Sequence, residues 1–187
     1  KNLEYWVEQD YLYLIDFAQV YYLASSRTSD PTVSEWLLSQ SEFTLHKELA
    51  LHLSYAKDLG IGRDKLRKTT KSPTCQAYTD FLIRTAAVEP FSVTIAALLP
   101  CFWGYYELGL GLEEKGLPDN ELYARWILQY TDPDYAKEVE YCKGLIDTLG
   151  AEANNCLIEQ MERAFITSSR YEYLFWEMCY KLEMWPV

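Results

Sequence analysis

The sequence has 187 residues, of which 49% are apolar and 24% are charged, and this balance predicts a folded chain with a sizeable hydrophobic core. The formal net charge of −11 argues against a nucleic-acid surface and against an anionic membrane surface, because both depend on Lys and Arg. No run approaches the roughly 18 apolar residues of a membrane span and no signal peptide is visible. We therefore expect neither nucleic acid nor a membrane as a partner.

The first half of the chain predicts two long helices, because apolar residues recur at three- and four-residue spacing without the alternation of a strand. The first helix is expected at about 3–25. Asp30 caps the second, which is expected to run without a break over about 31–59 and to end at the C-cap Gly60. The basic stretch "GRDKLRKTTK" (62–71) is interpreted as a solvated linker.

Five further helices are expected in the second half. Ser72 and Pro73 open one, and a long apolar helix starts at about Pro90. The remaining three are "DNELYARWILQY", "DPDYAKEVEYCKGLIDTLG" and a last helix at about 151–181. Seven helices joined by short links predict one all-α bundle over residues 1–187.

The five cysteines are widely spaced and include no CxxC pair, which favours a reducing, cytoplasmic setting over a disulfide framework or a zinc site. Sixteen Tyr, seven Phe and six Trp supply much of the apolar surface that can be buried. Rings with polar tips could line a pocket for a flat, polar ligand. A tyrosine-rich core whose hydroxyl groups reach solvent is the alternative interpretation.

Cys101 follows Pro100 inside the apolar stretch "IAALLPCFWGYYELG". Pro100 removes a backbone donor and crowds the carbonyl of Ala96, which predicts a kink that turns the thiol away from ideal packing. A kink that only bends the helix around the core is the alternative. Taken alone, Cys101 is more often a small core residue than a nucleophile.

Two carboxylates lie on helix faces that should be buried. Asp10 shares a face with Tyr13, and Glu172 shares one with Phe175. A buried carboxylate is costly unless it is paired, and Lys and Arg are sparse near both faces. The expected partners are therefore tyrosines or a bound ligand. The alternatives are a solvent-facing Asp10 and a surface ion pair of Glu172 with Arg170.

The two histidines lie in "EFTLHKELALHL", where Glu42 and His46 are four residues apart and Glu48 and His52 follow. This spacing is a possible start for a metal site. No other helix offers the second Glu-x-x-His set that dinuclear bundle sites require. We therefore predict no metal site and interpret these side chains as solvent-facing polar residues.

Three segments, in order, resemble the motifs of the TenA family, also called thiaminase II: "QDYLYL", "ALLPCFWGYYELG" and "SSRYEYLFWEMCY". The resemblance covers nearly the whole chain and implies a haem-oxygenase-like helical bundle assembled as a homotetramer. It also implies a cytoplasmic enzyme of thiamin salvage that needs no cofactor. The helix that precedes the first motif in the family is absent here, so we expect the chain to lack that helix.

The same resemblance implies roles for individual residues. Cys101 takes the place of the nucleophile and Glu172 that of the general acid and base. Asp10 would hydrogen-bond the aminopyrimidine, and Tyr13 would lie beside the thiol and help to activate it. The residues that match substrate contacts or pocket-lining rings of the family are Tyr78, Tyr105, Tyr130 and Phe175.

The implied reaction converts 4-amino-5-aminomethyl-2-methylpyrimidine to hydroxymethylpyrimidine and ammonia, and thiamin is a second implied substrate. Two alternatives stay open. One is an oxidase on the same bundle, like the enzyme of pyrroloquinoline-quinone synthesis, which should be richer in His and Arg than this chain. The other is a regulator that binds a pyrimidine without converting it.

Overall fold

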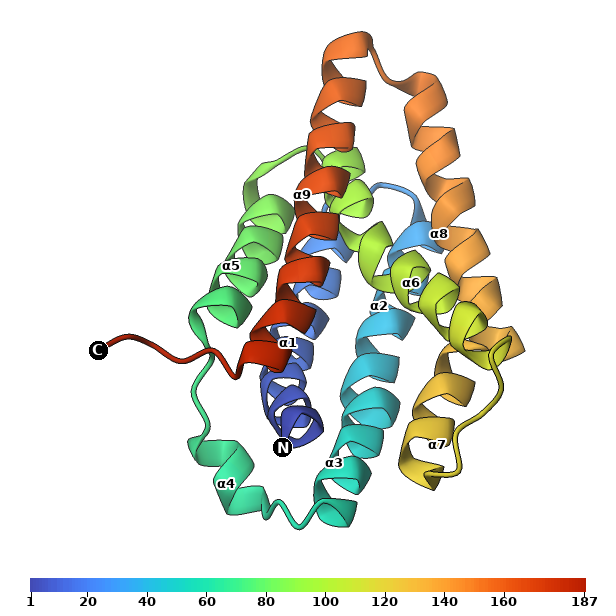
Figure 1. The fold of residues 1–187 in the computed structure, drawn as a ribbon. Coiled ribbons are helices and arrows are strands. Elements are labelled where there is room, and N and C mark those ends of the chain that lie inside the picture. The colour runs from blue at the N-terminus through green and yellow to red at the C-terminus, as the bar shows by residue number, and fades with distance from the viewer. The chain divides into compact units, whose positions relative to one another are not determined.

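The computed structural model describes residues 1–187, and every regular element in it is a helix, which confirms the predicted all-α class (Figure 1). The helices are α1 (Asn2–Ser25), α2 (Pro31–Phe43), α3 (Leu49–Asp58), α4 (Arg63–Lys68), α5 (Pro73–Val88), α6 (Phe91–Glu113), α7 (Glu121–Tyr130), α8 (Pro133–Glu152) and α9 (Asn155–Lys181). The last helix begins four residues later than expected, because α8 continues to Glu152.

The residues group into two compact units. Unit 1 comprises Lys1–Phe91 and Arg170–Val187, and unit 2 comprises Ser92–Ser169. In unit 1, α1 packs against α2, α3 and α5 (Figure 1). Half of the residues of α1 are buried, and they form one broad continuous face, so this helix contributes much of the unit 1 core.

Three predicted helix starts are confirmed by their capping bonds. Asp30 Oδ1 accepts from the backbone N–H groups of Thr32 at 2.8 Å and Val33 at 3.3 Å. Ser72 and Asp132 cap α5 and α8 in the same way, and a proline follows each of the three caps. These boundaries are predictable because the cap residue and the proline act on the adjacent backbone alone.

The prediction of an unbroken helix over 31–59 is wrong at one point. A π-helical segment, Thr44–Glu48, separates α2 from α3. A π turn adds a residue to the helical repeat and rotates the following residues around the helix axis, a change that apolar periodicity does not reveal. The predicted end is confirmed, since Gly60 has φ of +74° and its N–H donates to the carbonyl of Lys57 at 3.0 Å.

The basic stretch 62–71 is not simply a solvated linker, because it contains α4. Leu66 in this helix is only 1% exposed, so α4 is anchored to the unit 1 core by one apolar side chain. Lys65 forms an ion pair with Glu8, and Lys71 forms one with Asp16, both on α1. The prediction failed because one apolar residue among many cations shows no periodicity.

Unit 2 contains α6, α7, α8 and the first part of α9. Residues 92–100 of α6 are all buried, and α7 packs against α8. By length and mean hydropathy α6 could cross a membrane, contrary to the sequence expectation, although 61% of its apolar window is buried within the protein. A buried core helix meets the same measure.

Helix α6 makes a close approach to the end of α7. A Cβ atom added to Gly109 would lie 3.0 Å from Cβ of Tyr130 and 3.2 Å from Cγ2 of Thr131. Gly109 is itself buried. The absence of a side chain at this position therefore allows the backbone of α6 to reach Tyr130.

Candidate functional site

Three of the predicted pocket residues meet in unit 1, although they come from three different helices. The ring of Tyr13 on α1 lies 5.3 Å from the ring of Tyr78 on α5 and 5.7 Å from the ring of Phe175 on α9. All three side chains are buried. The structure therefore brings Tyr13, Tyr78 and Phe175 together, and their roles toward a substrate stay predictions from the family resemblance.

Glu172 joins this cluster through a hydrogen bond. The hydroxyl of Tyr78 donates to Oε1 of Glu172 at 2.6 Å, and the Glu172 side chain is half-buried. A tyrosine is thus a partner of this carboxylate, as the scarcity of nearby cations predicted. On its other face the Tyr78 ring stacks on Tyr171, with ring centroids 5.2 Å apart.

Asp10 is buried, with 6% of its surface exposed, as its position on an apolar helix face predicted. Its partner is neither a tyrosine nor a ligand. Oδ2 of Asp10 lies 2.5 Å from Nε2 of His52 on α3. His52 is fully buried, so the interpretation of this histidine as a solvent-facing residue is wrong. The signal was available, because Leu49, Tyr55 and Ala56 lie three or four residues from His52 and therefore share its helix face.

A second carboxylate, Glu48, affects the same histidine. The Nδ1 atom of His52 lies 2.9 Å from the backbone carbonyl oxygen of Glu48. Burial raises the pKa of Glu48 to about 7, although His52 partly offsets this effect. Burial alone would lower the pKa of His52, but the charge and hydrogen bond of Asp10, together with Glu48, outweigh it and raise that pKa above 6.5.

The other two residues of the histidine segment, Glu42 and His46, are exposed as predicted. No three His, Cys, Asp or Glu side chains in the chain gather in a way that could hold a metal ion.

In unit 2, Cys101 lies on α6 with its side chain half-buried. The hydroxyl of Tyr135 donates to the backbone carbonyls of Cys101 at 3.3 Å and of Phe102 at 3.1 Å. This bond ties the Cys101 turn of α6 to the start of α8. The sequence reasoning did not identify Tyr135, because nothing in its local pattern indicates a partner 34 residues earlier in the chain.

Two further predicted residues lie together in unit 2. The rings of Tyr105 on α6 and Tyr130 on α7 are 4.9 Å apart, and both are buried. Trp126 contacts both rings and Tyr135 contacts Tyr130. The resulting aromatic cluster contains two expected residues, Tyr105 and Tyr130, and two that were missed.

The remaining cysteines differ from Cys101. Cys75, Cys142 and Cys179 are buried, and burial raises the pKa of the Cys75 and Cys142 thiols to about 12. The pKa of Cys179 is raised further by the same cause. These three thiols therefore stay protonated at neutral pH. Cys156 is exposed.

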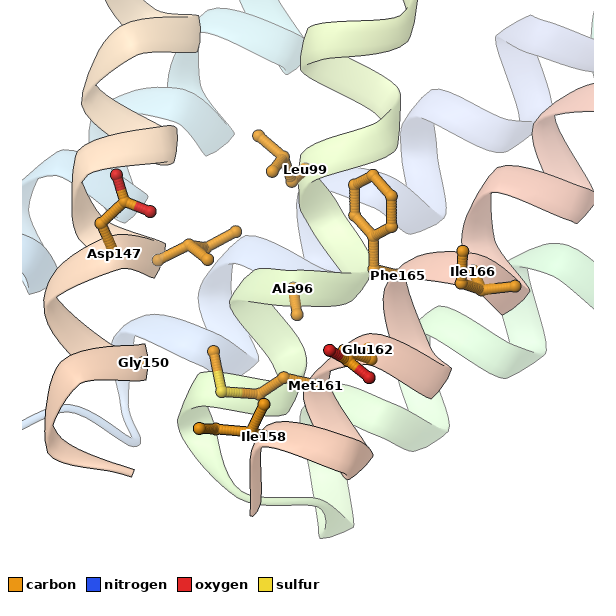
Figure 2. Close-up of a pocket in the computed structure, with 10 residues that line it drawn as sticks. Ala96, Leu99, Asp147, Gly150, Ile158, Met161, Glu162, Phe165 and Ile166 are labelled. Atoms are coloured by element: carbon orange, nitrogen blue, oxygen red, sulfur yellow. The ribbon is translucent and has the colours of Figure 1, made fainter. Parts of the chain in front are cut away.

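Unit 2 also contains an apolar cavity of about 630 Å³ (Figure 2). Its walls come from α6, α8 and α9, and the ring of Phe165 and the side chains of Leu99 and Met161 point into it. Asp147 and Glu162 are its only charged lining residues. None of the predicted site residues lines this cavity, so it is separate from the Tyr105–Tyr130 cluster.

The predicted site residues fall into two groups. Unit 1 holds the two carboxylates and three rings, and unit 2 holds the thiol and two rings. Within each unit the tyrosines lie against one another or against a carboxylate. That both groups face one ligand stays a prediction from the family resemblance.

Comparison with known proteins gives the family. Residues 1–182 match the TENA/THI-4/PQQC family. This chain belongs to that family. Two curated relatives in the family are each named aminopyrimidine aminohydrolase. The protein from Halalkalibacterium halodurans is 33% identical over 98% of this chain and 83% of its own length, and the protein from Bacillus subtilis is 34% identical over 98% and 78%.

Solved structures agree with the family assignment. The TenA homologue from P. horikoshii OT3 superimposes with a TM-score of 0.87 at 26% identity, and the match covers 96% of this chain and 83% of that one. A domain from Shewanella denitrificans OS217, described as having a heme oxygenase-like fold, superimposes with a TM-score of 0.74 at 12% identity over 97% of this chain and 79% of that one. The haem-oxygenase-like fold predicted for this TENA/THI-4/PQQC chain is therefore confirmed.

Proposed function

We propose that this chain is an aminopyrimidine aminohydrolase of the thiaminase II type that acts in thiamin salvage without a cofactor. The observation that carries the proposal is the 33–34% identity to two curated aminopyrimidine aminohydrolases over 98% of the chain. The reaction adds water to 4-amino-5-aminomethyl-2-methylpyrimidine and releases hydroxymethylpyrimidine and ammonia. Thiamin is a second substrate, from which the thiazole is released.

The chemistry requires an acid and a nucleophile, because a neutral pyrimidine is a poor electrophile and its amine a poor leaving group. Glu172 protonates a ring nitrogen, and the thiolate of Cys101 adds to the ring carbon beside it. The electron pair displaced by this addition breaks the bond between the methylene carbon and the amine, which leaves as ammonia because it enters the reaction in its protonated, ammonium form. Water then adds to the methylene carbon and loses a proton, and the thiolate leaves the ring as the ring nitrogen returns its proton to Glu172.

The two carboxylates have different surroundings, which supports different roles for them. Asp10 lies beside the imidazole of His52, and its carboxylate can accept a hydrogen bond from an amino group. Glu172 instead accepts a hydrogen bond from the neutral hydroxyl of Tyr78. Environments that separate the roles of two carboxylates are typical of acid–base sites.

The choice of Cys101 as nucleophile is supported by comparison with the other thiols. Three of them are buried and have raised pKa values, and a protonated thiol is a weak nucleophile. Cys101 is half-buried beside the turn that carries Tyr105. Tyr105 and Tyr130 supply flat faces that suit stacking on a pyrimidine ring.

The cytoplasmic location and the homotetramer belong to the same proposal. The widely spaced cysteines, none of which forms a disulfide, support a reducing compartment. The homotetramer rests on the resemblance to TenA, and sedimentation of the purified chain would measure it.

The first prediction concerns turnover. The wild-type chain, incubated with 4-amino-5-aminomethyl-2-methylpyrimidine, should release ammonia and a hydroxymethylpyrimidine identified by mass spectrometry. Cys101→Ser should lower turnover by a factor of roughly 100 or more, because a hydroxyl is a far weaker nucleophile than a thiol at neutral pH. Parallel incubation with thiamin would show whether the thiazole is released.

Cys156→Ser is the matched control, since Cys156 is an exposed cysteine and should be dispensable. Both variants should keep the helical circular dichroism of the wild type. A Cys101→Ser variant with wild-type turnover would remove Cys101 from the mechanism. A wild type that binds the pyrimidine without releasing ammonia would contradict the proposed function and favour a regulator.

A further inference from the structure

His52, which has no part in the family resemblance described above, forms a buried pair of ionisable side chains with Asp10 in unit 1. His52 is fully buried and Asp10 is 6% exposed. Nε2 of His52 lies 2.5 Å from Oδ2 of Asp10. The Trp6 ring lies 5.1 Å from the imidazole and the Tyr55 ring 5.9 Å from it. Aromatic groups therefore separate this ion pair from water, which strengthens the attraction between its members.

The contacts of the imidazole determine where its protons lie. Nδ1 is 2.9 Å from the backbone carbonyl oxygen of Glu48, and a carbonyl oxygen can only accept, so Nδ1 carries a hydrogen. Nε2 lies 2.5 Å from Oδ2 of Asp10, a separation at which two lone pairs would repel, so we infer that Nε2 carries a hydrogen as well. Both imidazole nitrogens thus hold a proton when Asp10 is the anion.

Glu48 is the other acid near this histidine. Its side chain is half-buried, and burial raises its pKa to about 7, so it holds its proton to a higher pH than an ordinary glutamate does. Asp10 is the acid in direct contact with the imidazole. The charge of His52 therefore interacts more strongly with the Asp10 carboxylate than with the side chain of Glu48.

We propose that His52 is a positioning residue that holds Asp10 as a carboxylate able only to accept hydrogen bonds, so that the site selects ligands presenting an amino group. The inference rests on the proposed function, in which Asp10 meets the amino group of the pyrimidine. His52 contacts Oδ2 of Asp10, and in the proposed site the other carboxylate oxygen accepts from the amino group of the ligand. A ligand with an acceptor in place of the amino group would meet the lone pairs of Asp10, and its binding would be weakened.

The protonation of His52 is measured directly by nitrogen-15 NMR of the imidazole side chains. The chain has only two histidines, and His46→Gln removes the signal of the exposed one, so the remaining signal is His52. We expect both nitrogens of His52 to show shifts of protonated nitrogen at pH 7.5, where an ordinary histidine is largely neutral. A bare nitrogen at this pH would overturn the inference, and the result does not depend on any enzyme activity.

Ligand selection is tested with His52→Phe, which keeps an aromatic ring beside Trp6 and Tyr55 but removes the charge and the donor. Titration calorimetry compares 4-amino-5-hydroxymethyl-2-methylpyrimidine with its 4-methoxy analogue, which has an ether oxygen and no N–H donor at that position. The wild type should prefer the amino ligand, and His52→Phe should reduce this preference by roughly tenfold or more, the effect of one charged hydrogen bond. His52→Gln, which restores a neutral donor, should recover part of the preference.

His46→Gln is the matched control and should leave the preference unchanged. If His52 only supported the fold, His52→Phe would weaken both ligands equally, and an unchanged preference would overturn the inference. Should His52→Phe fail to fold, the NMR measurement on the histidine of the otherwise native chain decides. A wild type that binds the amino ligand but releases no ammonia from the aminomethyl substrate would contradict the proposed function alone.

Discussion

The hydroxyl group of Tyr78 donates a hydrogen bond to Oε1 of Glu172 at 2.6 Å. The ring of Tyr78 is packed between Tyr13 and Tyr171 and is fully buried. The packing fixes where the hydroxyl points, and the hydroxyl in turn fixes one oxygen of Glu172. A residue outside the proposed chemistry thus orients the proposed acid.

Replacement of Tyr78 by Phe should separate these two contributions. The ring contacts remain, so the free energy of unfolding should fall by about 1 kcal/mol, the usual net value of a hydrogen bond. Turnover should fall by about tenfold, because Glu172 loses the donor that orients it. Ammonia release and urea unfolding measure the two effects. Tyr171→Phe, which removes a hydroxyl from the other side of the stack, is the control and should leave turnover within about twofold of the wild type.

At the scale of single residues, the sequence predicted burial better than it predicted partners. The apolar neighbours of Asp10 show that the carboxylate lies on a buried face, since burial depends on the helix's own pattern. The partner of Asp10 is 42 positions away, on a helix that follows a π-helical segment. Such a contact depends on the rotation of one helix against another, which no local pattern contains.

At the scale of helices, the starts were predictable and the irregular segments were not. Asp30, Ser72 and Asp132 each act on the backbone two or three residues ahead, so their chemistry is local. The π-helical segment 44–48 and the short helix α4 are stabilised by contacts with other parts of unit 1. Leu66 shows this for α4, because its burial comes from packing rather than from helix propensity.

Truncation of Leu66 tests whether α4 belongs to the unit 1 core. Leu66→Ala should lower the free energy of unfolding by about 2–5 kcal/mol, the range for a fully buried leucine. Arg67→Ala, at the adjacent exposed position, should change it by less than about 0.5 kcal/mol. Urea unfolding measures both. Equal, small effects of the two variants would mean that the basic stretch behaves as the solvated linker first expected.

At the scale of the molecule, two buried groups make stability depend on pH. The pKa of Glu48 is about 7 in the folded chain and 4.5 ordinarily, so the folded state holds this proton more tightly than the unfolded state. The contribution of Glu48 to the free energy of unfolding is fully present below about pH 4.5 and is lost as the pH rises to about 7. His52, whose pKa is also raised, contributes stability below pH 6.5 that is lost as the pH passes its folded value. Both groups act in the same direction.

The free energy of unfolding should therefore fall between pH 5 and pH 8. Glu48→Gln should flatten this dependence by on the order of 1 kcal/mol, since the half-buried side chain remains partly solvated. Urea unfolding at four pH values, in low and in high salt, measures the effect. High salt screens the repulsion that arises from the net charge of −11, so a difference between the two proteins that persists in salt belongs to the buried group. Stability that rises with pH in the wild type would contradict the expectation.

The fold class was predictable for the whole chain because helical periodicity repeats in nearly every segment and the motif order resembles one family. The missed residues His52, Glu48 and Tyr135 share one property. Each acts through a side chain or backbone group that is distant in sequence or lies beyond an irregular turn. Local propensity does not encode such contacts, and packing determines them.

The close approach at Gly109 has a consequence for how this helix can vary. A Cβ atom at position 109 of α6 would press on Cβ and the backbone of Tyr130. Even the smallest side chain at this position would therefore displace Tyr130 at the end of α7. The constraint is steric and independent of charge or polarity. Gly109 thus helps to set the position of the Tyr130 ring, and a larger residue at this position would require the end of α7 to move by a few tenths of an ångström.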